Sequence, residues 1–362
     1  MKKLLPLIAA AALLAVAAVV VTSRNARPRR LDPELGKPLV TGLAQLFQDG
    51  AVQTIAIRSP ESSATLAFGE NGWTVAERGG YPADTSKLGS AMMTAADITI
   101  GQRAPASMPA LDPADCTSIE WRDADGVRRA GVLLGPDRDA VASPSAEPWG
   151  RAGGGRYVAR DEKSPVYIVR NSLSALSPDP AYWLDTQLLA LSPTAIQSIA
   201  VRHPDGDVVN LAKPADGGDL TLADLADNEE FVSSRLYDIA NAPTSLSLLD
   251  VAATNLADEV TGLSNAVVCS VAAESNTVYE VRIGAVTPDK RGRYATVKVS
   301  DAAIDARYSG WTYILSAYNA NRLMPRRESF VRAKKVEEKT EEKAEEERPA
   351  GDVTQGATGV DK

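Results

Sequence analysis

Few residues of this sequence have the type and spacing that acid–base or nucleophilic chemistry requires. His203 is the only histidine, so a Ser-His-Asp triad would have to use it. It stands in the segment His203-Pro204-Asp205-Gly206, which is typical of a hairpin turn, and no serine lies on a strand-to-helix elbow. We therefore predict a turn residue at position 203, not a catalytic base.

Two carboxylate pairs, Asp123/Asp125 and Asp137/Asp139, are the other candidates for chemistry. Glycoside hydrolysis needs two carboxylates at a set separation across a cleft. Both pairs fall in segments where aspartate favours local hydrogen bonds of turns. No residue is therefore predicted to be catalytic, and a carboxylate-dependent hydrolase of envelope glycan is kept as an alternative function.

Metal and cofactor sites are not predicted either. Two cysteines and one histidine cannot form a zinc pattern. Cys116 and Cys269 lie near predicted strands. We expect two buried free thiols, and a disulfide bond between them in an oxidising compartment is the alternative. The run Gly153–Gly155 lacks the preceding strand and following helix of a phosphate-binding loop.

Composition excludes one class of partner. The chain has 362 residues, a formal net charge of −8 and 5% aromatic residues. A negative charge and few stacking side chains argue against nucleic acid as a partner. The length suggests two domains of ordinary size.

The N-terminal segment Leu4–Val21 carries no charge and follows Lys2 and Lys3. Eighteen helical residues span roughly 27 Å, enough for a bilayer core. We predict an uncleaved single-pass anchor, with a cleaved secretory signal as the alternative. The globular part is expected in the periplasm or otherwise outside the cytoplasm, because long domains translocate largely regardless of charge. Four arginines between Arg24 and Arg30 favour the opposite orientation.

Alternating apolar residues and turn signals predict a first α+β unit at residues 52–178. The expected helix has Asp84 as its N-cap and buries Leu88, Met92 and Ala95. Met92 and Met93 at this spacing are typical of a core, although a ligand groove is the alternative. The expected strands are Val52–Arg58, Ala64–Phe68, Trp73–Val75 after a turn at Asn71-Gly72, Thr117–Arg122, Val127–Leu134, Arg156–Ala159 and Val166–Arg170. The loop at residues 136–154 is the longest irregular stretch.

The chain then repeats itself. Ile55-Ala56-Ile57-Arg58 returns as Ile199-Ala200-Val201-Arg202, 144 residues later. The same offset places Asn228 at the cap position of Asp84 and Leu236 at the core position of Met92. We therefore predict a second α+β unit at residues 179–330, so that two tandem, mostly antiparallel sheets each have one main helix.

The seam between the units contains Trp183 and Asp185, which are the candidate residues for an interdomain or partner contact. Its sequence is Tyr182-Trp183-Leu184-Asp185, followed by Leu188-Leu189 and by Ile196 and Ile199. Together with Gly72-Trp73 and Val75 before Ala83-Asp84, this seam resembles the domain of unknown function 4340 family over roughly Gln53 to Phe330. The resemblance implies a place beside ABC-type transporters of the gliding-motility kind, and no catalytic residue or cofactor.

Two segments lie outside the predicted units. Residues 32–51 are expected to connect the anchor of residues 1–31 to the first unit, with weak helical character from Val40 to Phe47. Residues 331–362 are rich in Lys and Glu and predict a solvated, disordered tail, with partner binding as the alternative.

Three functions remain open at this stage. The first is a non-enzymatic, membrane-anchored accessory protein that binds subunits of an ABC-type transporter or another envelope complex. The second is the glycan hydrolase. The third is a protein whose two units clasp a small ligand between them.

Overall fold

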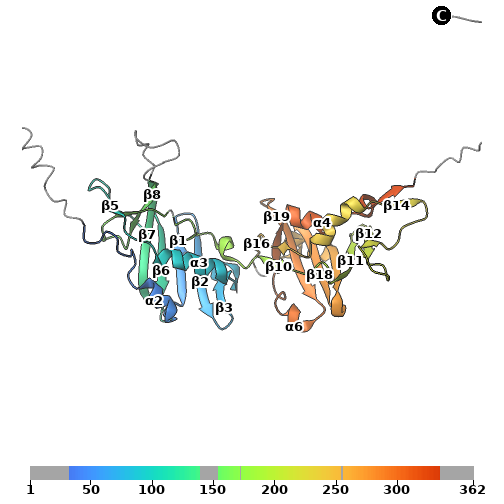
Figure 1. Cartoon of the computed structure of the whole chain (residues 1–362), viewed down its shortest axis with the longest axis horizontal. Coiled ribbons are helices and arrows are strands. Elements are labelled where there is room, and N and C mark those ends of the chain that lie inside the picture. The colour runs from blue at the N-terminus through green and yellow to red at the C-terminus, as the bar shows by residue number, and fades with distance from the viewer. Residues whose placement is uncertain (1–31, 139–153, 172, 254–255, 335–362) are drawn as a thin grey trace, which may run out of the picture.

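The computed structural model describes residues 32–138, 154–171, 173–253 and 256–334. Two sheets lie end to end along the long axis of the molecule (Figure 1). Every pairing between the described strands is antiparallel, and the helices are few and short, so the predicted α+β class is confirmed.

The first sheet has the order β4-β3-β2-β1-β6-β7-β8-β9-β5. Its strands are β1 (Thr54–Arg58), β2 (Ser63–Gly69), β3 (Gly72–Val75), β4 (Tyr81–Pro82), β5 (Gln102–Arg103), β6 (Thr117–Arg122), β7 (Arg128–Arg138), β8 (Gly155–Ala159) and β9 (Tyr167–Val169). The hairpin predicted at Asn71-Gly72 turns one residue earlier, because Gly69 pairs with Gly72. Most of the long loop, residues 139–153, lies outside the described residues.

The second sheet has the order β13-β12-β11-β17-β18-β19-β20-β16. Its strands are β11 (Ile196–Arg202), β12 (Val208–Ala212), β13 (Thr221–Leu222), β16 (Asp250–Val251), β17 (Val267–Ala273), β18 (Val278–Val286), β19 (Gly292–Val299) and β20 (Tyr313–Ser316). Two small ladders join β10 (Gln187–Leu189) to β15 (Leu246–Ser247) and β14 (Glu229–Phe231) to β21 (Val331–Ala333).

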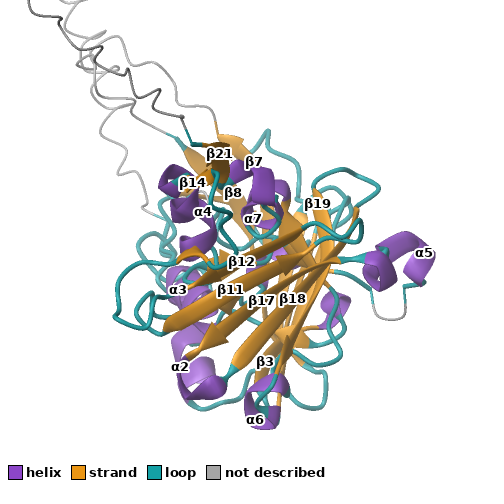
Figure 2. Ribbon diagram, turned by 90° about the vertical axis from the view of Figure 1, so that its right-hand side faces the viewer, coloured by secondary structure: helices purple, strands orange, loops and turns teal. Residues whose placement is uncertain are grey.

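Helices are short apart from one. They are α2 (Leu43–Gln48), α3 (Thr85–Ala96), α4 (Leu236–Asn241), α5 (Asp258–Thr261), α6 (Ala302–Asp305) and α7 (Ala317–Arg322). The 3₁₀ turns are η1 (Ala76–Arg78), η2 (Pro180–Trp183), η3 (Ser233–Arg235), η4 (Leu263–Asn265), η5 (Glu274–Asn276) and η6 (Arg327–Ser329). Viewed along the long axis, α3 and α4 lie on the same side of the strands (Figure 2). Among the described residues no helix is long and apolar enough to cross a membrane, and the predicted anchor Leu4–Val21 lies outside them.

Helix α3 has the predicted cap. The Asp84 side chain accepts a hydrogen bond from the backbone N–H of Lys87 (2.9 Å), which satisfies one of the free amides of the first turn. Leu88, Ala91, Met92 and Ala95 form its buried face against the sheet. The apolar spacing read from the sequence is therefore confirmed for this helix.

The cap predicted at Asn228 is wrong. Asn228 is exposed and precedes β14, while the second helical segment begins at η3, whose N-cap is Val232. Asp84 thus corresponds to Val232, a spacing of 148 residues instead of 144. The extra residues lie mainly in the loop from Lys213 to Leu220, which replaces the two-residue turn between β2 and β3.

One pair of hydrogen bonds closes both units in the same way. The Asp84 N–H donates to Trp183 O (2.8 Å), and the Val232 N–H donates to Phe330 O (2.8 Å). Trp183 and Phe330 are both fully buried, 147 residues apart. The predicted boundary at residues 178/179 therefore falls inside the first unit, whose last contact is made by the seam.

Two glycines show why neighbouring strands approach so closely. A Cβ on Gly155 would overlap the Val169 carbonyl oxygen, and a Cβ on Gly292 would overlap that of Leu315. Gly155 begins β8, which pairs with β9 from Arg156 onwards, and Gly292 begins β19 and pairs with Ser316 of β20, so the two glycines stand at corresponding places in the two sheets. Only glycine leaves room for the backbone there.

The ends of the predicted units also differ from expectation. Leu39 and Leu43, from the segment predicted as a connector, are buried in the core of the first unit. Val331–Ala333, predicted as the start of a disordered tail, form β21 because they pair with β14. Residues 335–362 lie outside the described residues.

The β14–β21 ladder supports a prediction on pH. Arg327 donates two hydrogen bonds to the Glu229 carboxylate (2.6 and 2.8 Å), and these, with the Ala226 N–H, hold the pKa of Glu229 at about 2, below its ordinary 4.5. Since the folded pKa is depressed, the contribution of this pair to stability is present above pH 4.5 and is lost as pH falls towards 2. Urea unfolding should show Glu229→Gln less stable than wild type at pH 7, with the difference shrinking between pH 4.5 and 2. A difference that stayed constant over this range would contradict the assignment.

Candidate functional site

Trp183 is a packing residue. Its side chain is fully buried, its indole N–H donates to Ser177 O (2.8 Å), and its ring packs edge-to-face on Tyr182 with centroids 5.0 Å apart. A side chain with no exposed surface cannot contact a partner directly. The structure therefore assigns Trp183 to the closure of the first unit.

Asp185 lies at the junction between the units. Its carboxylate accepts a hydrogen bond from Arg307 (3.3 Å), and its backbone N–H donates to Pro82 O (3.0 Å). The pair is half-exposed and contributes little by itself. Asp185 thus contacts both units, through Pro82 of the first and Arg307 of the second.

The edge of the first sheet meets the opposite edge of the second at this junction. Tyr81 of β4 packs edge-to-face on Trp311 and Tyr313, with ring centroids 5.0 and 6.2 Å away. Arg78 donates to both oxygens of Asp250 on β16 (2.5 and 2.9 Å). Burial raises the pKa of Tyr81 and of Tyr313, so both phenols stay protonated at physiological pH. Aromatic rings and an ion pair fill this side of the junction.

The candidate acid–base residues have structural partners. Asp123 accepts from the backbone N–H groups of Asp125 and Val127 (3.0 and 2.8 Å) and from Arg129 (2.6 Å). Burial alone would raise the pKa of Asp123, but these hydrogen bonds outweigh it and hold the pKa below its usual range. His203 lies in its turn with Nε2 3.0 Å from Pro325 O. Asp139, from the other carboxylate pair, lies outside the described residues.

Thiols and metal ligands do not gather in the described part of the chain. Cys116 and Cys269 are free and buried, and burial raises the pKa of Cys269 to about 12. No group of three His, Cys, Asp or Glu side chains lies close enough to hold a metal ion among the described residues.

A largely apolar opening on the first unit forms a groove. It has a volume of about 530 Å³ and runs along α3, with α2 as one wall and Trp73 of β3 at its margin. We call it the α2–α3 groove. Its lining residues are Ala44, Phe47, Gln48, Trp73, Thr85, Leu88, Gly89, Met92, Met93, Ala96 and Asp97.

The groove is open to solvent and apolar at the same time. Met93 is 69% exposed, and Phe68, which packs on Trp73 at 5.4 Å, is 48% exposed. Met92 is buried, and its sulfur accepts from the Trp121 indole N–H (3.3 Å). Met92 therefore packs in the core and also lines the floor of the groove, while Met93 is its exposed methionine.

The second unit lacks the wall that makes this groove. At the place of α2 the chain forms only a turn at Ser192–Ala195 before β11. Helix α4 has six residues where α3 has twelve. The α2–α3 groove is thus a feature of the first unit that the shared architecture does not require.

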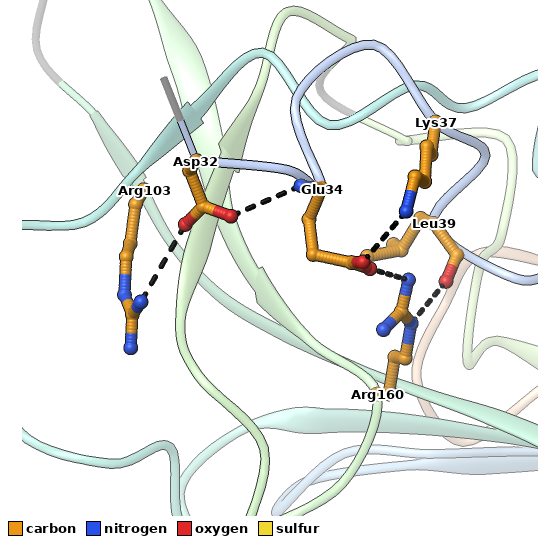
Figure 3. A network of polar contacts seen from close by, with 6 residues as sticks. All are labelled: Asp32, Glu34, Lys37, Leu39, Arg103 and Arg160. Atoms are coloured by element: carbon orange, nitrogen blue, oxygen red, sulfur yellow. Dashed lines mark hydrogen bonds and ion pairs between the residues drawn. The ribbon is translucent and has the colours of Figure 1, made fainter. Parts of the chain in front are cut away.

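A polar network fixes the segment that leads into α2. Arg160 donates to Leu39 O (2.7 Å) and to Glu34 (3.0 Å), and Lys37 also donates to Glu34 (3.0 Å), as Figure 3 shows. These hydrogen bonds lower the pKa of Glu34. Arg103 forms a longer contact with Asp32 (3.5 Å). The chain is therefore tied to the first sheet from Asp32 onwards.

The sequence contains only part of the signal for this groove. The weak helical character of Val40 to Phe47 indicated α2, and the pattern around Met92 indicated α3. Their contact was not predictable, because it depends on the path of the chain between residue 48 and residue 85. Gly89 inside a helical pattern was a local sign that was missed.

Comparison with known proteins gives one match. Residues 148–266 match the model of a family described as a domain of unknown function, DUF4340. No curated protein and no solved structure matches the chain. The matched region runs from the last strands of the first unit, across the seam, to the residue before β17. The match supports the resemblance of the seam to the domain of unknown function 4340 family, over residues 148–266.

Proposed function

We propose that this protein is a non-enzymatic accessory protein, anchored in a membrane by Leu4–Val21, whose globular part lies outside the cytoplasm and binds a subunit of an ABC-type transporter or another envelope complex. The observation that carries the proposal is the α2–α3 groove, an open apolar surface beside the point where the chain enters the first unit. Open apolar grooves on folded proteins mark binding sites.

The polar clusters of the first unit favour binding over catalysis. Glu120 is surrounded by Arg58, Arg122 and Arg128 at the surface of the sheet. Burial alone would raise the pKa of Glu120, but the hydrogen bond and charge of Arg122 outweigh it and lower the pKa. A carboxylate held ionised by arginine is a poor proton donor, which glycoside hydrolysis needs.

We further propose that the two units are tandem repeats of one ancestral unit. Support comes from the shared strand order, the paired closing contacts of Trp183 and Phe330, and the paired glycines Gly155 and Gly292. In this view α2 and the groove are additions to the first copy. A repeated scaffold with one modified copy is a common way to present a binding surface on a rigid support.

The location can be tested with spheroplasts. Protease added from outside should digest the bulk of the full-length chain, which should stay in the membrane fraction at high salt because burial of an apolar helix is insensitive to ionic strength. A variant that lacks residues 1–30 should be soluble and folded, because the strands of both sheets are formed by residues after position 31. Protection of the chain in intact spheroplasts would reverse the topology and remove the envelope role.

The partner can be tested on the full-length protein extracted in mild detergent. Affinity capture should recover transporter or envelope-complex subunits, and the soluble variant should recover less, because anchoring raises the local concentration near a membrane complex. Capture of no membrane protein would contradict the proposed function.

A further inference from the structure

Two residues of the α2–α3 groove are locally unfavourable, and the first is Gly89. It lies in the interior of the twelve-residue helix α3, where glycine disfavours the helix relative to alanine. A Cβ at this position would meet no atom within 4 Å. Packing within the chain therefore does not require glycine, and the missing side chain leaves part of the groove open.

The second is Asp97, the C-cap of α3. A carboxylate there lies at the negative end of the helix dipole, an arrangement that disfavours the helix. The carboxylate is exposed and has no ion pair or hydrogen bond to any described side chain or backbone group. Asp97 therefore gives the groove an uncompensated negative charge at the end of α3.

Gly89 and Asp97 each disfavour the helix, and both line the same groove. This indicates a ligand whose binding compensates for both residues. An apolar side chain over Gly89 would fill the open space, and a cation beside Asp97 would pair with the carboxylate and with the helix C-terminus. Met93 and Trp73 supply an adaptable and an aromatic wall for such a ligand.

We propose that the α2–α3 groove binds an amphipathic helix of an integral membrane partner, with an apolar stripe along α3 and a lysine or arginine against Asp97. This inference rests on the proposed function and names the surface that serves it. The stripe would take the i, i+4, i+7 spacing by which helices lie in apolar grooves. A lipid acyl chain would fill the apolar part but would leave Asp97 without a partner.

The length of the segment between the predicted anchor and the first unit indicates where in the partner this helix lies. Ten residues separate Val21 from Asp32, and they span at most about 35 Å when extended. From Asp32 the chain is fixed to the sheet, and α2 begins at Leu43. An anchored protein therefore holds the groove close to the membrane surface, within reach of a juxtamembrane helix.

The test uses full-length protein in cells, with the photo-crosslinker p-benzoylphenylalanine in place of Met93. Irradiation should give an adduct whose partner peptide, sequenced by mass spectrometry, is an amphipathic helix that carries Lys or Arg. The added substitution Gly89→Leu should lower the adduct yield about ten-fold by filling the groove. It should also raise the melting temperature, because leucine favours the helix and its Cβ meets no atom.

Ser90→Leu is the matched control. Ser90 is exposed on the same helix but does not line the groove, so the adduct yield should stay within about two-fold of wild type. Asp97→Asn should lower binding of the synthetic partner peptide about five-fold, and a peptide with Glu in place of its Lys or Arg should bind wild type weakly.

The outcomes separate this inference from the proposed function. Lipid adducts, adducts to an acidic or non-helical segment, or equal loss in Gly89→Leu and Ser90→Leu would overturn the groove as the docking site. Recovery of transporter subunits in the same cells would then leave the accessory function standing. A mapped amphipathic helix with loss only in Gly89→Leu would support the inference.

Discussion

Truncation of Trp183 to alanine is expected to destabilise the first unit by about 3–5 kcal/mol, the range measured for large aromatic residues in protein cores. The side chain has no exposed surface, and its indole N–H donates to Ser177 O. Alanine would leave a cavity against Tyr182, and the Ser177 carbonyl oxygen would lose its hydrogen bond. The backbone bond from Asp84 to Trp183, which holds the start of α3, would lose its support.

Phe330→Ala should have a matching effect on the second unit, because Phe330 is equally buried and stacks on Phe231 with centroids 6.4 Å apart. Hydrogen exchange should show loss of protection in α3 and β1–β4 for the first variant. For the second variant, protection should be lost in α4 and β11–β13.

Urea unfolding gives the magnitudes, with Tyr237→Ala as control. Tyr237 is 75% exposed, so its truncation should change stability by less than about 0.5 kcal/mol. Loss of protection in α4 upon Trp183→Ala would show that the seam belongs to the second unit, as the sequence had suggested.

The strands of both sheets were predictable because their alternation is strict and their turns carry strong signals. Thr117–Arg122 occurs as predicted, and the correspondence of Ile57 with Val201 holds, since each lies at the same place in its own ladder. Strand position is set by local pattern, which a single sequence contains.

The register of the second helix was not predictable for a physical reason. An error of four residues, from Val232 to Asn228, is close to one helical turn of 3.6 residues, so the apolar positions still fall on the same face. Helical periodicity therefore cannot detect such a slip. The insertion between β12 and β13 and the pairing of β14 with β21 decide the register, and both are tertiary features.

The candidate site was predictable only in part. The sequence singled out Trp183 and Asp185 as candidate contact residues of the seam. In the structure Trp183 packs in the core, and Asp185 contacts Arg307 of the second unit. The α2–α3 groove was considered at Met92 and Met93, but it depends on a helix contact between residues distant in sequence. Gly89 and Asp97 each break a local rule, and this sign is readable before the fold is known.

The second large effect is expected at the junction between the sheets. Tyr81→Ala should destabilise the protein by about 3 kcal/mol, because Tyr81 is buried against Trp311 and Tyr313. Arg78→Ala should add about 1–3 kcal/mol by leaving the Asp250 carboxylate, which is largely shielded from solvent, without its two hydrogen bonds. Arg58→Ala is the control, because its ion pair with Glu120 is half-exposed and lies within one unit.

The junction variants should change cooperativity as well as stability. The hydrophobic core is continuous across the junction, so wild-type protein should unfold in one transition. The double substitution Tyr81→Ala and Arg78→Ala should split this unfolding transition into two. It should also widen the distribution of inter-unit distances in small-angle scattering. One transition with unchanged scattering would show that Asp185, Arg307 and the seam suffice to fix the units.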